Sequence, residues 1–249
     1  MGKDDQVWQT AELTATFLTG VRSAIPLAQE QIAVMLRLIR AARPAVNLVL
    51  DLGCGDGILG QAVLDQHPEA QGVFLDFSPP MLDAARKRLA GYGRALIANV
   101  DYGQTDWRAR LDEIVSGHFA VSDGFDVIVS GYSIHHQPDG RKREIYAELY
   151  DLLRPGGIFL NLEHVASRSP WVEQRFADLF IDALVDYHLR AGVPKTPEQV
   201  DREFYSRPDK AANKLALVET QCEWLREIGF LHVDVYLKIF ELALFGGVR

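Results

Sequence analysis

A glycine-rich run that follows an aspartate is the first feature of the chain that could bind a cofactor. Asp51 directly precedes the segment Leu52 to Gly57, in which Gly53, Gly55 and Gly57 alternate with other residues. Because glycine has no Cβ, a ligand can approach this backbone closely, and a following helix would offer unpaired N–H groups. A carboxylate beside the loop repels a pyrophosphate and attracts an ammonium or a sulfonium. The run therefore favours a cationic ligand over a dinucleotide.

A second acid, Asp76, stands 25 residues after Asp51, at the end of another short apolar run. This distance is close to one strand–helix–strand repeat, so both acids would lie at the same edge of a parallel sheet. A carboxylate at the second position can accept hydrogen bonds from both hydroxyls of a ribose. Either acid could instead only cap a turn at a strand end.

Side chains that could move a proton follow the later apolar runs. His135 and His136 have side-chain pKa values that are ordinarily near neutrality, which suits a general base. Tyr132 stands in the same segment, and Glu163 with His164 follows the next run. A reaction that depends mainly on positioning needs no base. The alternative for the two neighbouring histidines is that one of them packs beneath the loop.

The elements that must position these residues are predicted by hydrophobic patterning. Short apolar runs bounded by acids and glycines predict buried parallel strands. Five such runs alternate with helical patterns, at 46–51, 72–76, 94–99, 125–130 and 158–162. Two more, at 230–237 and 239–244, predict a closing hairpin. The pattern predicts an α/β fold with a doubly wound, mostly parallel, seven-stranded sheet and right-handed crossovers.

Helical periodicity predicts the segments around the sheet. Two helices with a break at Pro26 precede the first strand, a long amphipathic helix spans 169–190, and a helix from Asn213 to Ile228 ends at Gly229. We expect one domain, 1–249, with an N-terminal helical lid, a cofactor-binding core, a helical insertion before the last two strands, and a closing helix with its hairpin (1–45, 46–163, 164–212 and 213–249).

Aromatic side chains gather in the predicted lid and insertion. They could roof an acceptor pocket or pack as ordinary core, since aromatic residues at helical spacing are typical of a buried helix face. The set comprises Trp8, Phe17, Trp171, Phe176, Phe180, Tyr187 and Tyr205.

The segment Val49 to Gly57 resembles the first signature of the class I S-adenosylmethionine-dependent methyltransferases, and Asp76 to Leu82 resembles the second. The segments 125–136 and 152–157 resemble the fourth motif and the turn before the fifth strand. Together these matches cover about residues 47–163. The resemblance implies a Rossmann-like sheet, S-adenosylmethionine as the cofactor and methyl transfer to a small-molecule acceptor.

The same resemblance implies roles for individual residues. Gly53 and Gly55 would lie against the methionine part of the cofactor, Asp51 would hold its amino group, and Asp76 would bind its ribose. Asp101 would meet the adenine with Tyr102 alongside, or Asn99 would if the register differs. The methionine side would be lined by Ser130 and Gly131. The other cofactor-binding residues expected within these motifs are Cys54, Phe77 and Met81. The catalytic candidates are His135, His136 and Tyr132.

Three further functions are compatible with the sequence. The C-terminal third resembles, more weakly, the carboxy-S-adenosylmethionine synthases of tRNA uridine modification. That family places an arginine in the helix before the final hairpin, where this chain has Glu223 and Trp224, with Arg226 displaced; the departure favours ordinary methyl transfer. The second is a non-catalytic cofactor-binding module, and the third is a dehydrogenase, which Asp51 disfavours.

Composition limits the partners and the compartment. The formal net charge of -8 disfavours nucleic acid as a substrate, because the whole molecule repels phosphate backbones. The two cysteines form no ligand or disulfide framework, and no His, Asp or Glu set has metal-ligand spacing, so we expect no metal. We see no secretory signal and no apolar run of about 18 residues, so we expect a cytoplasmic protein that avoids membranes. A homodimer is possible.

Overall fold

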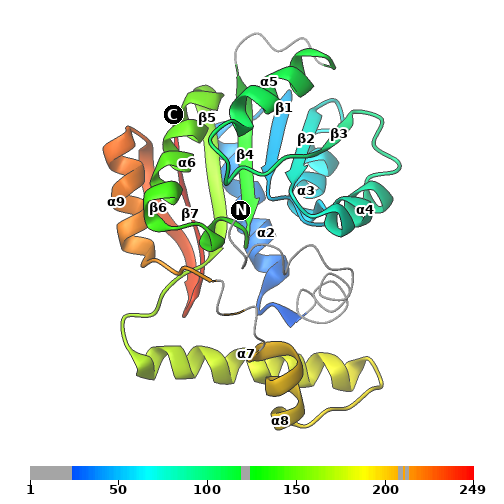
Figure 1. Ribbon diagram of the computed structural model, residues 1–249, viewed down its shortest axis with the longest axis vertical. Helices are drawn as coiled ribbons and strands as arrows, with labels where there is room; N and C mark the ends of the chain where they lie inside the picture. Colours follow the sequence, from blue (N-terminus) through cyan, green and yellow to red (C-terminus); the bar gives the residue numbers. More distant parts are fainter. Residues whose placement is uncertain (1–23, 119–123, 207–209, 211–212) are drawn as a thin grey trace.

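The chain forms a seven-stranded sheet with the strand order β3-β2-β1-β4-β5-β7-β6 (Figure 1). This computed structural model describes residues 24–118, 124–206, 210 and 213–249. Five strands are parallel: β1 (Leu48–Leu52), β2 (Gln71–Asp76), β3 (Ala95–Asn99), β4 (Phe125–Gly131) and β5 (Leu153–His164). The antiparallel hairpin comprises β6 (Leu231–Ile239) and β7 (Leu242–Val248). The predicted doubly wound, mostly parallel sheet with a closing hairpin is confirmed.

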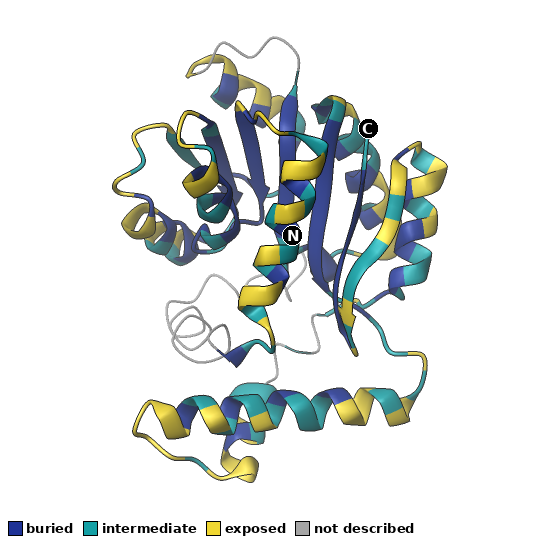
Figure 2. Ribbon diagram, turned by 180° about the vertical axis from the view of Figure 1, so that it is seen from behind, coloured by how far each residue is buried: buried dark blue, intermediate teal, exposed yellow. Residues whose placement is uncertain are grey.

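Helices cover both faces of the sheet, and each face has its own apolar core. The first core involves α2 (Ala28–Ala42), α3 (Ile58–Gln66) and α4 (Pro79–Arg88). The second involves α5 (Trp107–Ser116), α6 (Asp139–Leu152) and α9 (Val218–Ile228). In β1, Leu48 and Leu50 belong to the second core and Val49 to the first. Figure 2 shows the inner strands of the sheet as buried along most of their length, whereas the edge strands β3 and β6 have no buried residue. Burial on both faces explains why β1 is a continuous apolar run.

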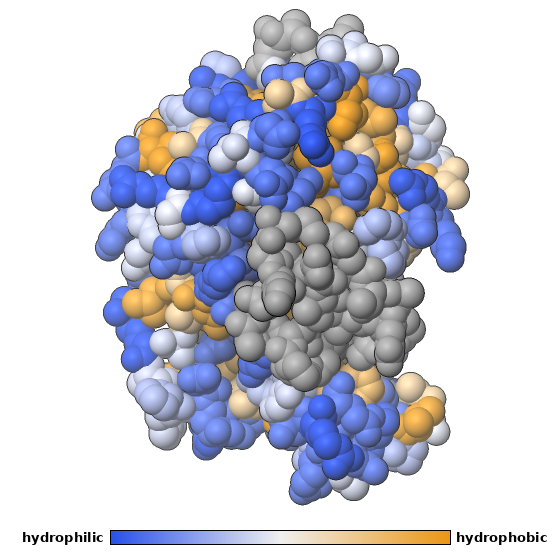
Figure 3. Space-filling model, in the orientation of Figure 1, coloured by the Kyte–Doolittle hydropathy of each residue, from blue (hydrophilic) through white to orange (hydrophobic). Residues whose placement is uncertain are grey.

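A further helical layer lies across the carboxyl ends of the parallel strands, and we call residues 170–205 the cap (Figure 1). It comprises α7 (Pro170–Arg190), α8 (Pro197–Val200) and the π-helical turn η5 (Asp201–Tyr205). The Ser169 Oγ accepts a hydrogen bond from the Val172 N–H at 3.4 Å, and Pro170 occupies the first turn, which starts α7 as expected for a capped helix. On the face in Figure 3, hydrophilic side chains dominate the outer surface of α8.

The closing helix is shorter than predicted. It begins at Val218 and not at Asn213. The Lys214 N–H donates to the His135 carbonyl at 2.8 Å, and the Ala216 carbonyl accepts from the Ala166 N–H at 3.0 Å. The backbone before Val218 is therefore hydrogen-bonded to other segments, which excludes it from the helix.

Other strand boundaries differ from the prediction, because the apolar pattern does not indicate the geometry of the turns. β7 starts at Leu242 and not at Ile239, since Phe240 adopts a left-handed φ of 49° in the hairpin turn. β5 starts at Leu153, five residues earlier than expected, with a register shift between Phe125 and Val127. The polar stretch between β3 and β4, which carried no prediction, contains α5.

At the N-terminus, α2 corresponds to the second predicted helix, and the first lies within residues 1–23, outside the described residues. In the part of the chain that the structure describes, no helix has both the length and the apolar character needed to cross a bilayer.

Candidate active site

A cavity of about 500 Å³ lies between the carboxyl ends of the parallel strands and the cap. Its wall includes residues from α2, the strand ends, α7 and η5. Most of the residues predicted to bind the cofactor or to act in catalysis are among those that line it: Asp51, Gly53, Cys54, Gly55, Asp76, Phe77, Met81, Gly131, Tyr132, His135 and His136. The sheet thus gathers positions that are far apart in the sequence, because parallel strands all end at one edge.

The glycine loop has a backbone that only glycine adopts without strain. Gly53 and Gly55 have φ values of 64° and 55°. A Cβ on Gly53 would stand 1.9 Å from the Ser133 Oγ, so the loop and the segment after β4 pack without room for a side chain. Ser133 also lines the cavity. Gly53 and Gly55 themselves line the cavity, so the loop forms a cradle whose backbone a ligand there can approach.

The Asp76 carboxylate is buried at the cavity wall and held by two backbone donors. It accepts hydrogen bonds from the Gly55 N–H at 2.9 Å and from the Ser78 N–H at 2.8 Å, one on each oxygen. Burial raises the pKa of Asp76 to about 6, although these hydrogen bonds oppose the shift. Each oxygen has a second lone pair, so the carboxylate can still accept from a pair of hydroxyls.

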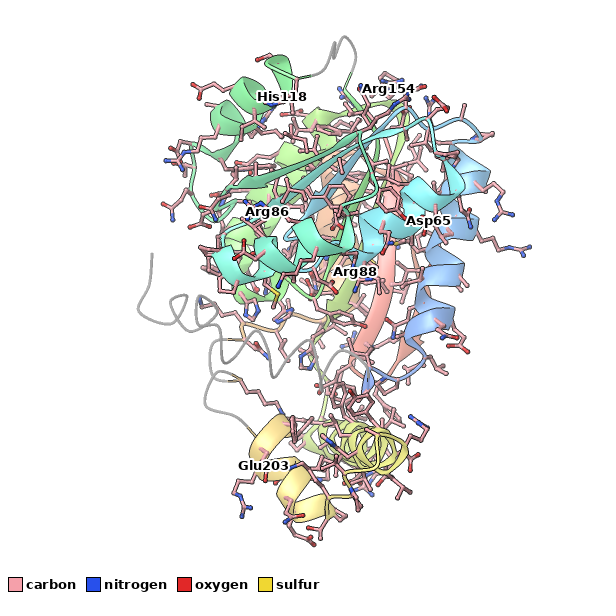
Figure 4. The ribbon with its side chains drawn as sticks, turned by 90° about the vertical axis from the view of Figure 1, so that its right-hand side faces the viewer. Asp65, Arg86, Arg88, His118, Arg154 and Glu203 are labelled. Carbon is pink, nitrogen blue, oxygen red and sulfur yellow. The ribbon has the colours of Figure 1, made fainter. Side chains whose placement is uncertain are left out.

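Asp51 has a structural contact in addition to its place in the cavity wall. Its Oδ2 accepts a hydrogen bond from the Gly60 N–H, in the first turn of α3, at 2.8 Å. A carboxylate at a helix N-terminus stabilises the helix through the helix dipole. One oxygen of Asp51 therefore caps a turn, as the alternative interpretation of this acid expected. Asp56 also lines the cavity and forms an ion pair with Arg88 of α4, which is labelled in Figure 4. Three acids and a glycine cradle at one end of the cavity fit a cationic cofactor that carries a ribose.

Three residues predicted to contact the cofactor are not among those that line the cavity. The Ser130 hydroxyl donates to the Leu52 carbonyl at 2.8 Å. The Tyr102 hydroxyl is 2.6 Å from the Ser133 Oγ, and its ring is buried in the core. The Asp101 carboxylate caps its own turn by accepting from the Gly103 N–H at 2.9 Å. Each of these polar groups thus has a hydrogen-bond partner within the protein.

His135 forms a buried pair with Glu163 at the end of β5. The His135 Nδ1 is 2.5 Å from the Glu163 Oε1, and the His135 backbone N–H donates to the Glu163 Oε2 at 3.1 Å. The short 3-10 turn η4 (Ile134–His136) turns this ring toward β5 while it also lines the cavity. The Asn213 side chain hydrogen bonds to the same ring. Because Nδ1 is engaged by Glu163, the remaining ring nitrogen is Nε2.

The surroundings of this pair set its protonation. Burial, together with the charges of His164 and Lys142, holds the pKa of His135 well below its ordinary value, so the ring is neutral near pH 7. Burial raises the pKa of Glu163 to about 7. The carboxylate also accepts from the His164 N–H at 2.9 Å, so backbone donors point at both of its oxygens. These donors favour the ionised carboxylate, with the shared proton on His135 Nδ1 and a lone pair on Nε2.

A second histidine–carboxylate pair stands beside the first. The His164 Nε2 is 2.8 Å from the Glu241 Oε2, and the centroids of the His164 and His135 rings are 5.8 Å apart. The centroid of the His136 ring is 4.0 Å from that of His135. Among the described residues, no group of three or more His, Cys, Asp or Glu side chains is placed to hold a metal ion. An imidazole in contact with a carboxylate, as in both pairs, can take part in proton transfer.

Tyr132 is held in a strained backbone conformation at the cavity wall. Its φ is 51°, in the left-handed region that non-glycine residues rarely adopt. Its N–H donates to the Leu162 carbonyl at 2.7 Å, and its hydroxyl donates to the Gln31 Oε1 of α2 at 2.6 Å. The hydroxyl is thus directed to α2, where it positions this loop.

The cap contributes an aromatic wall that sequence reasoning identified only in part. Phe176, Phe180 and Tyr205 line the cavity as one interpretation expected, whereas Trp171 is 69% exposed. Tyr187 lies outside the wall, and Trp8 and Phe17 lie outside the described residues. The wall also has members that no motif marked, namely Gln31, Phe204, Lys210 and Asn213. Such isolated residues in polar or helical segments carry no local signal.

The chain is similar to known methyltransferases. Residues 50–159 match a family described as "Methyltransferase domain". The chain is 27% identical over 210 residues to the ubiquinone/menaquinone biosynthesis C-methyltransferase UbiE of Desulfotalea psychrophila, covering 83% of this chain and 74% of that protein. It is 24% identical over 170 residues to the carboxy-S-adenosyl-L-methionine synthase of Campylobacter lari, covering 68% and 67%.

The fold is similar to that of an O-methyltransferase family protein from Burkholderia thailandensis, with a TM-score of 0.57 and 20% identity. That match covers 86% of this chain and 55% of the solved one, so this chain spans about half the length of its structural relative.

Proposed function

We propose that this chain is a class I S-adenosylmethionine-dependent methyltransferase that methylates a small-molecule acceptor whose proton is taken by His135. One observation carries this proposal: His135, which is paired with Glu163, lines the same cavity as the glycine loop and Asp76. A proton acceptor and a cofactor cradle are therefore placed to act on the same bound acceptor.

The residues at one end of the cavity fit the cofactor. The backbone of Gly53 and Gly55 would hold its methionine part, Asp51 its amino group and Asp76 its ribose hydroxyls. When bound, S-adenosylmethionine supplies a methyl group on a sulfonium, which a nucleophile displaces in line. The contribution of the chain is to align the acceptor and to exclude water with the cap, which is the kind of positioning that accounts for much of the rate in such reactions.

His135 supplies the proton chemistry. Its Nδ1–H is donated to Glu163, so the lone pair of Nε2 can take the proton of an acidic O–H or C–H as the acceptor attacks. The resulting imidazolium is stabilised by the Glu163 carboxylate, which is already hydrogen-bonded to it. We propose that the acceptor replaces the Asn213 amide at Nε2 when it binds.

Three further observations support a small-molecule acceptor. A cavity of about 500 Å³ is in the range of small-molecule sites and is roofed by the cap. The net charge of -8 disfavours a nucleic-acid partner. The relative named for ubiquinone and menaquinone biosynthesis points to the same class of acceptor. Cytoplasmic location and a homodimer stay predictions from the sequence.

The synthase alternative is less well supported. None of the residues of α9, all of which are described, lines the cavity. Arg226, the arginine displaced from the expected position, donates from Nη2 to the Val233 carbonyl of the hairpin at 3.0 Å. That contact is structural, so α9 offers no cation for the carboxylate of a modified cofactor.

The test incubates the full chain with methyl-labelled S-adenosylmethionine and a fractionated small-molecule extract. We expect label in an extractable small molecule, and a loss of roughly a hundredfold or more in rate for His135→Ala, as is usual when a general base is removed. The Kd of S-adenosylhomocysteine, measured by calorimetry, should stay within about threefold, because His135 is placed at the acceptor end.

Binding of NAD without binding of S-adenosylhomocysteine would contradict the cofactor assignment. Binding of S-adenosylhomocysteine without transfer of label to any fraction would favour the non-catalytic module. Label found only in RNA or protein would contradict the small-molecule acceptor.

A further inference from the structure

The acceptor side of the cavity contains an unbroken series of ring contacts. Centroid distances are 5.8 Å from His135 to His164, 5.4 Å from His164 to Phe176 and 5.7 Å from Phe176 to Phe180. The series ends with Tyr205, 5.9 Å from Phe180. All five rings line the cavity and are at distances typical of packed aromatic pairs. They form a continuous apolar surface that starts at the proposed base and ends in the cap.

A lysine stands at the far end of this series. The Lys210 Nζ is 3.6 Å from the centroid of the Tyr205 ring, and Lys210 lines the cavity. Within the described ranges, no carboxylate is at ion-pair distance from its ammonium. Burial lowers the pKa of Lys210, although Glu241, Glu173 and Asp201 oppose the shift through space. A cation that is partly desolvated and lacks an anionic contact can gain strongly from a bound anion.

Two of these three acids have other partners. Glu241 is buried and contacts His164 at 2.8 Å, and Asp201 accepts from the Ser206 hydroxyl at 2.6 Å. By comparison Lys195, a cap lysine that also lies near an aromatic ring, has its Nζ 2.6 Å from the Glu203 Oε2. Lys195 does not line the cavity. Among the described residues, the Lys195 ammonium thus has a carboxylate partner and the Lys210 ammonium has none.

Charge is separated along the cavity. The cofactor end carries Asp51, Asp76 and the Asp56–Arg88 ion pair, and the acceptor end carries Lys210 and the two histidine–carboxylate pairs. An acidic end suits a cationic cofactor, whereas a cationic group beyond an apolar wall suits a molecule that has an anionic group at one end. A single ammonium balances the charge of one carboxylate.

We propose that the acceptor is an elongated monocarboxylate with an apolar or aromatic body, whose reactive end lies at His135 and whose carboxylate lies at Lys210. The body packs along the rings of Phe176, Phe180 and Tyr205. This inference rests on the proposed function and names the substrate class of the same cavity. Lys210 is here a specificity residue, since it contacts the acceptor and takes no part in the methyl transfer.

The experiment measures binding of benzoate, phenylacetate and cinnamate to the full chain, each compared with its uncharged amide, by calorimetry with saturating S-adenosylhomocysteine. We expect at least one carboxylate to bind about tenfold more tightly than its amide, as expected for one charge-assisted hydrogen bond. Lys210→Met should remove this preference, Lys210→Arg should retain most of it, and Lys195→Met, the matched control, should leave it unchanged.

Absence of a carboxylate preference across all three pairs, including absence of binding, would overturn the inference. So would a preference that survives in Lys210→Met. Far-UV circular dichroism and the affinity for S-adenosylhomocysteine check that each variant is folded. The titrations are repeated without S-adenosylhomocysteine. If the protein does not bind S-adenosylhomocysteine, the proposed function fails, but the preference for a carboxylate over its amide can still be measured.

Discussion

Burial controls the protonation of the carboxylates at the cavity wall. Asp76 and Glu163 have pKa values raised to about 6 and about 7, in both cases mainly because the charged form is removed from water. A raised pKa in an acid means that the folded protein takes up a proton at a higher pH than an exposed carboxyl would. Cofactor binding and proton transfer should therefore each depend on pH, in different ranges.

For Asp76, we expect the affinity for S-adenosylhomocysteine to fall as the pH decreases through about 6. Protonation makes the carboxyl neutral, and its hydrogen bonds from the ribose lose their charge assistance. Asp76→Asn should bind roughly ten- to a hundredfold more weakly at neutral pH and lose the dependence on pH. Calorimetry from about pH 5 to about pH 8 measures both effects. A native affinity that is constant across this range would contradict the assignment.

For Glu163, we expect the rate of methyl transfer to rise with pH through about 7, because the ionised carboxylate keeps the His135 Nδ1–H in place. Glu163→Gln should abolish this inflection and lower kcat, with KM for the cofactor little changed. A purely structural role would instead lower activity without altering the pH profile. The measurement is kcat against pH for both proteins, with the affinity for S-adenosylhomocysteine as the folding control.

At the scale of elements, the cap is attached to the rest of the fold by a small apolar cluster of its own. Leu184 is fully buried there, with Phe176, Val200 and Leu242 of β7 among its members. Such a cluster, separate from the two main cores, gives the cap a stability of its own. We therefore expect that the roof of the cavity can open without unfolding of the sheet.

Leu184→Ala should remove about 2–5 kcal/mol of packing free energy from this cluster. Hydrogen exchange followed by mass spectrometry should show faster exchange in α7 and α8, while β1 and β4 stay protected. Leu189→Ala is the matched control, because Leu189 is on the same helix but 62% exposed. Equal acceleration in the cap and in the sheet would mean that the two unfold together.

At the scale of the whole molecule, one buried acid joins the ends of several elements away from the cavity. Asp126 is fully buried and accepts hydrogen bonds from the Asn47 N–H at 2.7 Å and the Leu48 N–H at 3.0 Å. It also contacts Arg43 at 2.5 Å and Arg154 at 3.1 Å. Figure 4 shows Arg154 at the opposite end of the molecule from Glu203 of the cap. The network thus stabilises the end of the sheet opposite the cavity.

Asp126→Ala should lower the free energy of unfolding by about 3–5 kcal/mol, because it leaves two arginines and two backbone donors without their anion. Urea unfolding measures this loss. Asp83→Ala, which removes an exposed helical ion pair with Arg86, should change it by less than about 1 kcal/mol. Similar losses in the two variants would show that the buried network is no more important than a surface pair.

The class of fold, the glycine loop and the two acids that frame it could be predicted from the amino-acid sequence. These features are local: an apolar run, the glycines of a tight turn and an acid at a strand end each lie within a few residues. The edge at which Asp51 and Asp76 meet then follows from the rule that parallel strands end together. Even so, the predicted start of α9 was wrong, because it is set by hydrogen bonds from the Lys214 N–H to His135 and from the Ala166 N–H to the Ala216 carbonyl.

The partners at the acceptor end depend on tertiary packing and could not be predicted. Glu163 is 28 residues from His135, and Glu241 is 77 residues from His164, so no spacing in the chain connects them. Lys210 has no motif around it, and it becomes notable only where it meets the Tyr205 ring at the cavity wall. A cofactor loop is one turn of the chain and can be identified within a short stretch of sequence. An acceptor site is assembled from single side chains of separate elements, which only the packing of those elements brings together.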